Sequence, residues 1–544
     1  MHPCERCSPW RIAAIGVCIL WSACAPYAFA QDAQSSAPAS TAGDAAAAPA
    51  EKFDIWEFRV VGSNVLDRKA TEHALYGYLG PGKSIAEVEQ ARQALETAYR
   101  NAGYSTVFVD IPEQTVDAGV VRLNVTEGKL ARLRVSGARY FSNRQILAHL
   151  PSLQEGDVPR LSETQRELAA LNRVTADRSI TPILRAGRDA GTVDVELRVT
   201  DDLPFHGSVE VNDRHTADTS KLRTSVNLSY DNLWQKAHSI SLQYQAAPEE
   251  RQEAKVIAGT YVARFDGIRP VLAMYAVNSS SDVATIGTLS VLGKGRIYGM
   301  RGILPLDPLG KFFQNLTLGV DLKDFDENIR LTEQDGVATA IKYVNWSSSY
   351  AFGWSLPRST SDFSLGASWG VRGLGNDDDE FEQKRFKARA NYAYLTGSAQ
   401  HSRQVFDKSR FVARMSWQYA NAPLISNEQF TAGGATSVRG YLEAERLGDR
   451  GASMSLEFHS PPLVNGPRVK DLHLFVFYDA AFLAIEDPLP GQDDRFRLSS
   501  AGAGLRFLGL GGLSAELDWA RALRDGANVL EGEDRVHFRL NYGF

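Results

Sequence analysis

The segment EQFTAGGATSVRGY, residues 428–441, places one arginine between two groups of glycines. Arg439 follows the pair Gly433 and Gly434 and directly precedes Gly440, so its guanidinium is carried by a tightly folded loop rather than by a strand. A loop of this kind can fold back on itself. A planar, permanently charged guanidinium held in such a loop can pair with a carboxylate in a defined geometry.

The carboxylate that could pair with Arg439 lies further along the chain, in LHLFVFYDAAF. Its apolar residues alternate with a second set, and the two sets are Leu472, Leu474, Val476, Tyr478 and His473, Phe475, Phe477, Asp479. A period of two predicts a strand. If the first set faces lipid, Asp479 faces the inside of a barrel, and we predict an ion pair between Arg439 and Asp479. The alternative is a surface arginine and an ordinary aspartate at a strand end.

Alternation of this kind recurs from residue 203 to the end of the chain. Three clear examples are KLRTSVNLSY, with Leu222, Thr224, Val226, Leu228 and Tyr230 on one face; RFKARANYAY, with Phe386, Ala388, Ala390, Tyr392 and Tyr394; and RFVARMSWQY, with Phe411, Ala413, Met415, Trp417 and Tyr419. Aromatic residues gather at the strand ends, as the two faces of a lipid bilayer require. The pattern predicts a transmembrane antiparallel β-barrel over residues 203–544, and a soluble two-sheet sandwich is the alternative. At roughly 21 residues per strand and connection, this length gives about 16 strands, with 12 to 18 fitting nearly as well.

The last predicted strand, RVHFRLNYGF, ends on an aromatic residue. One face carries Val536, Phe538, Leu540, Tyr542 and Phe544. We interpret Phe538, Leu540, Tyr542 and Phe544 as a C-terminal signal that a barrel-inserting machinery recognises during assembly. The alternative is a closing strand that happens to end in phenylalanine.

The first 52 residues have the composition of a secretory signal sequence followed by a flexible segment. Residues 1–30 combine a basic start, an apolar segment and the small residues Ala28 and Ala30, which together predict a cleaved signal sequence. A lipoprotein signal at Cys24 is the alternative. Residues 31–52 are rich in Ala, Ser and Pro and predict a flexible tether. No later segment has 18 consecutive apolar residues, so a membrane crossing would have to use a closed barrel.

Residues 53–127 and 128–202 repeat one order of elements, strand, helix, helix, strand, strand. The first copy predicts helices near residues 67–79 and after Ser84, where Glu87 completes a capping box. In the second copy the predicted helix starts are Ser142 with Gln145 and Ser162 with Gln165, and Leu168 and Leu171 lie on the apolar face. An extended polypeptide could add to the edge strands of such domains. Spacers that bind nothing are the alternative.

Charge and motifs argue against two function classes. The formal net charge of -6 gives no basic excess for binding nucleic acid. The ten histidines are scattered, and no G-x-S-x-G or H-E-x-x-H motif occurs, so we predict no enzyme activity, no catalytic residue, no metal site and no cofactor. All four cysteines lie in the first 24 residues, and Cys4 and Cys7 have no second pair with which to bind a metal.

The chain after the signal sequence resembles the outer-membrane transporters of two-partner secretion, the filamentous haemagglutinin and haemolysin exporters. These belong to a superfamily of barrels with POTRA domains. SVRGY, residues 437–441, resembles the signature of the long sixth loop, and FYDAAF resembles the strand motif whose aspartate meets the loop arginine. GYSTVFVDIPEQ and TVDAGVVRLNVTEGKL resemble the end of a first POTRA domain, and DNLWQKAHSISLQY resembles a first barrel hairpin.

The resemblance implies a location, a partner and a mechanism. The barrel would lie in the outer membrane of a Gram-negative bacterium, in contact with its lipid, with both POTRA domains in the periplasm. It would export a large unfolded partner protein of the β-helical adhesin or haemolysin type through its pore. Val438, Arg439, Gly440 and Tyr441 would lie in the lumen, with Asp479 as their partner on the wall.

Two points leave alternatives open. Family members often carry an amphipathic plug helix before the first POTRA domain, but residues 31–52 have no amphipathic pattern and contain Pro38 and Pro49. A POTRA-barrel insertase that assembles other outer-membrane proteins is the second functional hypothesis, although two repeats favour the secretion transporter. A solute porin would need neither the repeats nor the loop signature.

Overall fold

The computed structural model describes residues 52–544, except residues 218, 251–253, 266, 282, 287–288, 326–339, 407 and 465. The described residues divide between Pro204 and Phe205 into two compact units, each of which is described by itself. The predicted signal sequence, the tether up to residue 51 and all four cysteines lie outside the described residues.

The first repeat is a small α+β domain with a three-stranded sheet. Its elements are β1 (Phe53–Ile55), β2 (Glu57–Val61), α1 (Arg68–Leu75), the 3₁₀ helix η1 (Tyr76–Tyr78), β3 (Gly80–Lys83), α2 (Ile85–Asn101), β4 (Val107–Asp110) and β5 (Val120–Glu127). The sheet order is β2-β5-β4, and β1 pairs with β3. The predicted capping box starts α2, because the Glu87 carboxylate accepts a hydrogen bond from Ser84 N at 2.8 Å. The helix predicted near residues 67–79 is shorter in the structure, because the chain leaves α1 after Leu75 and passes through η1 into β3.

The second repeat has the same order of its main elements, strand, helix, helix, strand, strand, without counterparts of β1, η1 and β3 among its described residues. Its elements are β6 (Lys129–Ser136), α3 (Asn143–Ala148), α4 (Leu161–Arg173), β7 (Arg178–Ala186) and β8 (Thr192–Asp201), with the sheet order β6-β8-β7. Leu168 and Leu171 are buried, as predicted. The predicted helix start at Ser162 is wrong, because α4 begins at Leu161 and Arg160 precedes it. Leu161 N donates to Gly103 O at 3.0 Å, so a contact with the first repeat, which no local pattern reveals, occupies this helix end.

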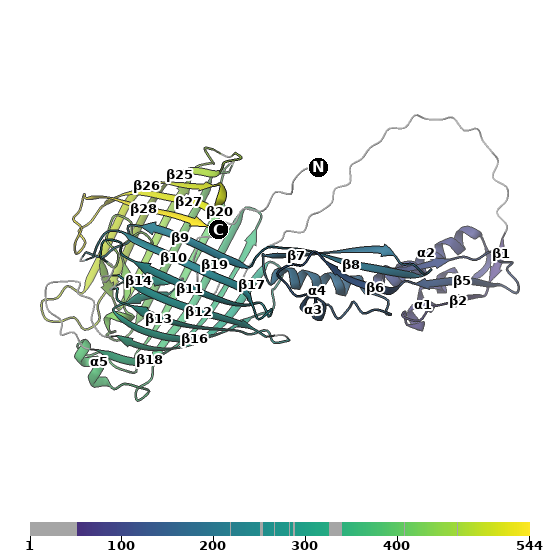
Figure 1. The fold of residues 1–544 in the computed structure, drawn as a ribbon, viewed down its shortest axis with the longest axis horizontal. Helices are drawn as coiled ribbons and strands as arrows, with labels where there is room; N and C mark the ends of the chain where they lie inside the picture. The colour runs from purple at the N-terminus through teal and green to yellow at the C-terminus, as the bar shows by residue number, and fades with distance from the viewer. Residues whose placement is uncertain are drawn as a thin grey trace. The chain divides into compact units, whose positions relative to one another are not determined.

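The second unit is a closed barrel of 16 antiparallel strands, and the predicted fold class is confirmed (Figure 1). The strands are β9 (Phe205–Asn212), β10 (Arg223–Leu233), β11 (His238–Ala246), β12 (Val256–Arg264), β13 (Val271–Ser279), β16 (Gly295–Pro305), β17 (Phe312–Phe325), β18 (Ile341–Leu356), β19 (Ser359–Gly370), β20 (Ala393–Gln404), β21 (Arg410–Ala420), β24 (Arg450–His459), β25 (Val469–Ala484), β26 (Arg495–Gly509), β27 (Leu513–Ala522) and β28 (Asp534–Gly543). Each strand pairs with the next, and β28 pairs with β9 to close the wall. Closure leaves no free edge.

Several short elements lie in the connections between barrel strands. They are β14 (Val283–Ile286) paired with β15 (Leu289–Leu292), α5 (Asp378–Lys384), η2 (Ser426–Glu428), β22 (Phe430–Ala432) paired with β23 (Arg446–Gly448), and η3 (Leu510–Gly512). We call the end of the barrel where β9 begins and β28 finishes the near end, and the opposite end the far end. Four far-end connections are used below: loop 5 (371–392), loop 6 (421–449), loop 7 (485–494) and loop 8 (523–533).

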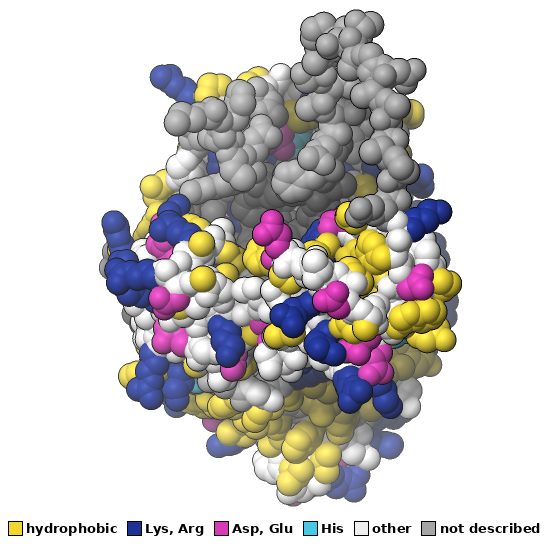
Figure 2. All heavy atoms as spheres, turned by 90° about the vertical axis from the view of Figure 1, so that its right-hand side faces the viewer, with side chains coloured by type: hydrophobic (Ala, Val, Ile, Leu, Met, Phe, Trp, Pro, Cys, Tyr) yellow, Lys and Arg dark blue, Asp and Glu magenta, His cyan; other side chains and the backbone are white. Residues whose placement is uncertain are grey.

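The two faces of the barrel strands differ as the alternation predicts. On β25, Leu474 and Val476 are 48% and 56% exposed, whereas Phe475 and Asp479 are 2% and 0% exposed. The apolar face therefore points away from the barrel axis and the other face points into the lumen. Among the described residues, no helix has the length and apolarity that a membrane crossing requires. Figure 2 shows a face of the molecule on which acidic and basic side chains are interspersed, without a large region of one sign.

The strand prediction for RFKARANYAY is wrong. Residues 385–392 belong to loop 5, and β20 begins only at Ala393. Ala388 and Tyr392 are buried in an apolar cluster with Phe381 of α5 and Tyr343 of β18. Residues 388–392 do alternate between buried and exposed, but the backbone of residues 385–392 runs through bends and turns, and its buried side chains pack against the inner wall. A period of two in the sequence therefore does not by itself establish a strand, and it does not say whether lipid or protein covers the apolar side chains.

Candidate functional site

Loop 6 folds back into the barrel and buries its tip against the inner wall. Val438 and Tyr441 have no exposed surface, and Arg439 is 4% exposed. The apolar residues of the tip form one cluster with the wall strands and loop 8, comprising Ala432, Val438, Tyr441, Leu442, Ala481, Leu483, Leu498, Ala522 and Val529. Burial of this apolar surface contributes to holding the loop in the lumen.

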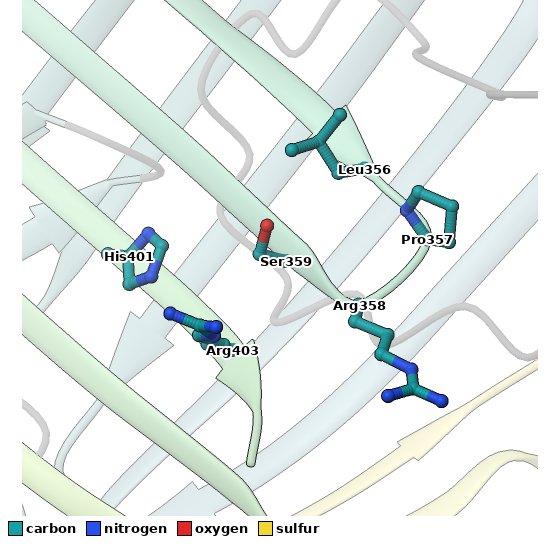
Figure 3. A pocket seen from close by; sticks show the side chains of 6 residues that line it. All are labelled: Leu356, Pro357, Arg358, Ser359, His401 and Arg403. Carbon is teal, nitrogen blue, oxygen red and sulfur yellow. The ribbon is translucent and has the colours of Figure 1, made fainter.

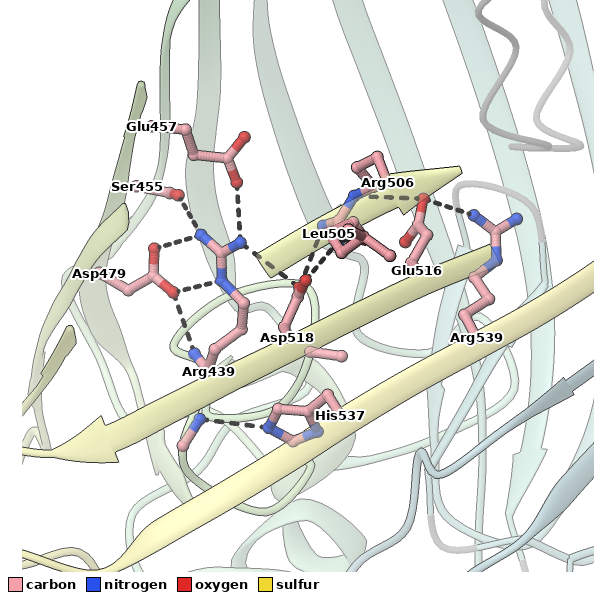
Figure 4. Close-up of polar contacts among 12 residues, drawn as sticks. Arg439, Ser455, Glu457, Asp479, Leu505, Arg506, Glu516, Asp518, His537 and Arg539 are labelled. Carbon is pink, nitrogen blue, oxygen red and sulfur yellow. Dashed lines mark hydrogen bonds and ion pairs between the residues drawn. The ribbon is translucent and has the colours of Figure 1, made fainter. Parts of the chain in front are cut away.

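The guanidinium of Arg439 makes a two-point contact with Asp479 (Figure 4). Nε donates to Oδ2 at 2.7 Å and Nη2 donates to Oδ1 at 2.8 Å. The backbone N of Arg439 also donates to Oδ2, at 3.1 Å. The sequence prediction named these two residues, and the structure brings them together. Two parallel bonds between a guanidinium and a carboxylate fix both the distance and the plane of the pair.

Further wall residues surround the same guanidinium. Nη2 donates to Ser455 Oγ at 3.0 Å, and Nη1 lies 2.9 Å from Glu457 Oε1 and 3.6 Å from Asp518 Oδ2. The ring centroid of Phe477 lies 3.5 Å from Arg439 Cζ, a cation–π contact. Arg439 therefore meets wall residues of β24, β25 and β27 at once, a set of contacts that a lysine cannot reproduce.

The glycines beside Arg439 are required by the shape of the loop. Gly440 has φ +92°, and an added Cβ would lie 3.3 Å from Ala520 Cβ on the wall. Gly433 has φ +111°, and an added Cβ would lie 2.5 Å from Leu442 O. Gly434, with φ +99°, would bring a Cβ to 2.3 Å from Glu443 Cδ. The loop can approach both the wall and itself only because these positions lack side chains.

Tyr441 connects the loop to two further elements. Its hydroxyl donates to Arg524 O of loop 8 at 2.7 Å and lies 3.0 Å from Ser499 O of β26. The phenol is fully buried, so these bonds satisfy a polar group that would otherwise be costly inside the barrel.

The family models match both parts of the chain. Residues 53–128 match the ShlB-type POTRA domain, and residues 314–507 match the family described as haemolysin secretion/activation protein ShlB/FhaC/HecB. The chain belongs to this family. It is an outer-membrane transporter of the two-partner secretion class, and the first repeat is a POTRA domain.

Named relatives are similar over most of the transporter. The outer membrane transporter CdiB of Dickeya dadantii (strain 3937) is 23% identical over 426 residues, which cover 74% of this chain and 71% of CdiB. The heme/hemopexin transporter protein HuxB of Haemophilus influenzae (strain 86-028NP) is 21% identical over 514 residues, which cover 90% of this chain and 86% of HuxB.

Solved structures show the same fold. CdiB from Escherichia coli matches with a TM-score of 0.60 and 18% identity over 93% of each chain. BamA from Haemophilus ducreyi lacking POTRA domains 1-3 matches with a TM-score of 0.56 and 15% identity, over 90% of this transporter and all of that chain. The fold is therefore shared with BamA, whereas the family model assigns the transporter to the secretion proteins.

Loop 6 of the transporter is also held by Asp449, a residue that the sequence analysis did not find. Asp449 is fully buried, and its carboxylate accepts from both terminal nitrogens of the Arg385 guanidinium in loop 5, from Nη1 and, at 2.6 Å, from Nη2. Its carboxylate also accepts from the backbone N of Leu424 in loop 6 at 2.9 Å and of Glu486 in loop 7 at 2.7 Å. One carboxylate thus ties loops 5, 6 and 7 together at the far end.

Two other acidic residues of the same segment act in a similar way. Glu445 Oε1 accepts from three consecutive backbone N atoms of loop 8, those of residues 527–529. Glu428 binds Lys323 Nζ at 2.5 Å, Tyr394 OH at 2.8 Å and Tyr343 OH, which attach the start of loop 6 to β17, β20 and β18. No spacing rule marks these residues, because several of their partners are backbone atoms or residues far away in the chain.

His537 connects the tip of loop 6 to the closing seam of the barrel (Figure 4). Gly440 N donates to its Nε2 at 3.2 Å, and its Nδ1 lies 3.0 Å from Asp213 Oδ2, beyond the end of β9. The two bonds together require a neutral ring with its proton on Nδ1. The backbone N of Phe538 donates to the other oxygen of Asp213 at 2.9 Å. The backbone pairing of β28 with β9 begins only at Arg539, so these side-chain contacts extend the seam toward the far end.

The residues of the predicted C-terminal signal lie along this seam. Leu540, Tyr542 and Phe544 are exposed on the outer face, and Phe538 is half-buried. Phe544 exchanges two backbone hydrogen bonds with Gly207, at 2.9 and 3.0 Å. In the folded barrel these residues finish the closing strand, and their role during assembly stays a prediction.

Replacing His537 by phenylalanine is expected to weaken the seam and reduce secretion. The ring shape is kept, but Gly440 N and Asp213 each lose a partner inside the barrel, at a cost of about 1 to 3 kcal/mol per unsatisfied group. We expect a lower midpoint temperature for unfolding, measured by the shift in gel mobility of the heated barrel. His206→Phe, on an exposed residue of β9, the other strand of the seam, is the matched control. An unchanged midpoint for His537→Phe would contradict the coupling.

Proposed function

We propose that this transporter exports one large secreted partner protein, of the adhesin or haemolysin type, across the outer membrane. The partner arrives unfolded in the periplasm, where the POTRA domains recognise it, and it passes through the barrel. Its folding outside opposes its return, because no nucleotide is available in the periplasm to drive transport. In this proposal the near end of the barrel faces the periplasm and the far end faces the cell exterior.

The edges of the two repeats support capture by strand addition. The strands β4 and β7 lie at sheet edges in equivalent places of the two repeats. A side chain of the second helix covers each edge at one position: Glu96 accepts from Val109 N at 3.2 Å, and Asn172 accepts from Ile180 N at 2.9 Å. The backbone of an extended partner can replace these local side-chain bonds with a ladder of hydrogen bonds along the whole edge.

The interior of the barrel supports a gated pathway. Loop 5 and the start of loop 6 pack against the inner faces of β12 to β18, and the tip of loop 6 packs against β25 to β27. The contact of Arg439 with Asp479 is the observation that carries the proposal, because it attaches loop 6, a long connection inside the pore, to one residue of the barrel wall. Passage of a polypeptide requires these loops to move.

Deleting residues 53–200 while keeping the signal sequence is expected to abolish secretion and leave the barrel inserted. The reason is that partner recognition is proposed to lie in the repeats, whereas the barrel closes through its own strands. The measurement is the amount of partner protein in the medium, with the partner taken from an adjacent large reading frame. Gel mobility before and after heating reports on the barrel.

The same deletion distinguishes the secretion transporter from an insertase and from a solute porin. For an insertase, many outer-membrane proteins would decrease instead of one secreted product. For a solute porin, conductance would survive the deletion and no secreted protein would depend on residues 53–200. Normal secretion by the deletion variant would overturn the proposed role of the repeats.

A further inference from the structure

A groove of about 510 Å³ lies on the barrel at its near end (Figure 3). Six residues line it, from the turn between β18 and β19 and from the adjoining part of β20: Leu356, Pro357, Arg358, Ser359, His401 and Arg403. Figure 3 shows Arg403 beside His401 on β20, facing Ser359 of β19, with Arg358 extending from the turn. None of these residues takes part in the contacts of loop 6.

The groove lies on the outer face of the wall, not in the lumen. On β20, Leu395 is 50% exposed, and His401 and Arg403 follow it at even spacing, so they share its face. On β18, Trp346 and Leu356 are 38% and 43% exposed and lie on one face by the same argument. Lipid would cover this face in a membrane.

A band of aromatic side chains runs beside the groove, further from the near end. The rings of Phe352 and Phe363 stack with centroids 5.2 Å apart, and Trp354 and Tyr350 lie 5.4 Å from Phe363 and Phe352, respectively. Aromatic bands mark the boundary between hydrocarbon and headgroups on barrels of this kind. The groove therefore lies at the level of the lipid headgroups.

The polar groups of the groove suit a phosphate. Arg358 and Arg403 are exposed, and no acidic side chain within the described part of the chain lies at ion-pair distance from either guanidinium. Ser361 Oγ lies 2.8 Å from His401 Nδ1, so Nε2 is the ring nitrogen not used by Ser361. Ser359 adds a hydroxyl. Two guanidinium groups match the geometry of phosphate oxygens better than two ammonium groups would.

We propose that this groove binds the headgroup of an anionic glycerophospholipid from the leaflet at the near end. The phosphate would lie against Arg403 and Arg358, and the acyl chains would run over Leu356 and the aromatic band. A lipid is the occupant because the groove opens on the face that lipid covers and continues into an apolar surface. The inference rests on the proposed placement of the barrel in the outer membrane.

The test compares two variants of the full chain in nanodiscs of phosphatidylcholine with a minor share of phosphatidylglycerol. The first variant is Arg358→Gln with Arg403→Gln. The matched control is Arg269→Gln with Lys311→Gln, which removes the same charge from exposed residues of neighbouring near-end turns. Native mass spectrometry measures the phosphatidylglycerol retained on the released protein. The first variant is expected to lose about fivefold or more of the retained lipid, and the control is expected to retain it.

Three results would overturn the proposal. They are equal retention by the first variant and the unaltered protein, an equal loss in the control, and displacement of the lipid by soluble glycerophosphate or inorganic phosphate. Gel mobility before and after heating establishes that each variant is folded. Secretion by the same variants is measured separately, so failure of export and failure of lipid binding are distinguishable.

Discussion

Replacing Arg439 or Asp479 by alanine is expected to reduce secretion of the partner at least about tenfold while the barrel stays inserted in the membrane. Each change leaves the opposite charge without its bidentate partner at a site where Asp479 is fully buried and Arg439 is 4% exposed. Removal of one member of a buried ion pair commonly costs about 3 to 5 kcal/mol in a dry site, and less where water enters. Docking of the loop tip should weaken by a large part of that amount. The barrel should persist, because its strand pairing does not depend on the loop.

The measurement is the amount of partner in the medium for each single variant and for the double variant. Arg439→Lys separates charge from geometry, because an ammonium keeps the charge but cannot hold Asp479, Ser455 and Glu457 together. Arg521→Ala is the control, since its pair with Asp534 joins neighbouring strands but is about half exposed. Full secretion by both Arg439→Ala and Asp479→Ala would refute the role assigned to the pair.

The Arg439 and Asp479 pair could be predicted because each residue stands in a strong local pattern. Glycines on both sides of Arg439 indicate a tight loop, and the period of two around Asp479 indicates which way its side chain points. The barrel was predictable for the same reason, since alternation of apolar and polar residues recurs along the part of the chain that forms its 16 strands. Where one local pattern of residues determines the backbone conformation, that conformation can be predicted from the sequence.

Other parts of the site were not predictable from local patterns. Asp449 accepts from backbone atoms of Leu424 and Glu486, and backbone N–H groups leave no trace in the sequence. His537 acquires its role from Gly440 and Asp213, which are brought together only when the barrel closes. The strand predicted around Tyr392 is wrong before Ala393, because this part of loop 5 turns and packs its buried side chains against the lumen wall. Contacts between distant segments decided each of these outcomes.

Replacing Asp449 by alanine is expected to release the far-end loops and increase the conductance of the barrel. The change removes the partner of Arg385 and leaves the backbone N atoms of Leu424 and Glu486 unsatisfied. Loss of a buried charge partner at about 3 to 5 kcal/mol shifts the balance between docked and released loops by more than about a hundredfold. Loop 6 would keep its contact at Asp479 but lose the one carboxylate that binds loops 5, 6 and 7 together. Single-channel recording in planar bilayers measures the effect.

A matched control lies between the same two loops. Lys387 of loop 5 pairs with Asp487 of loop 7 at 2.9 Å, but both side chains are about half exposed. An exposed pair of this kind contributes about 0 to 1 kcal/mol, so Asp487→Ala should leave the conductance unchanged. Limited proteolysis adds a second readout, because released loops 5 and 7 should be cut in Asp449→Ala and not in the control. If Asp449→Ala conducts like the unaltered barrel and resists cleavage, the buried carboxylate does not hold these loops closed, and the apolar packing of loop 5 against Tyr343 is sufficient by itself.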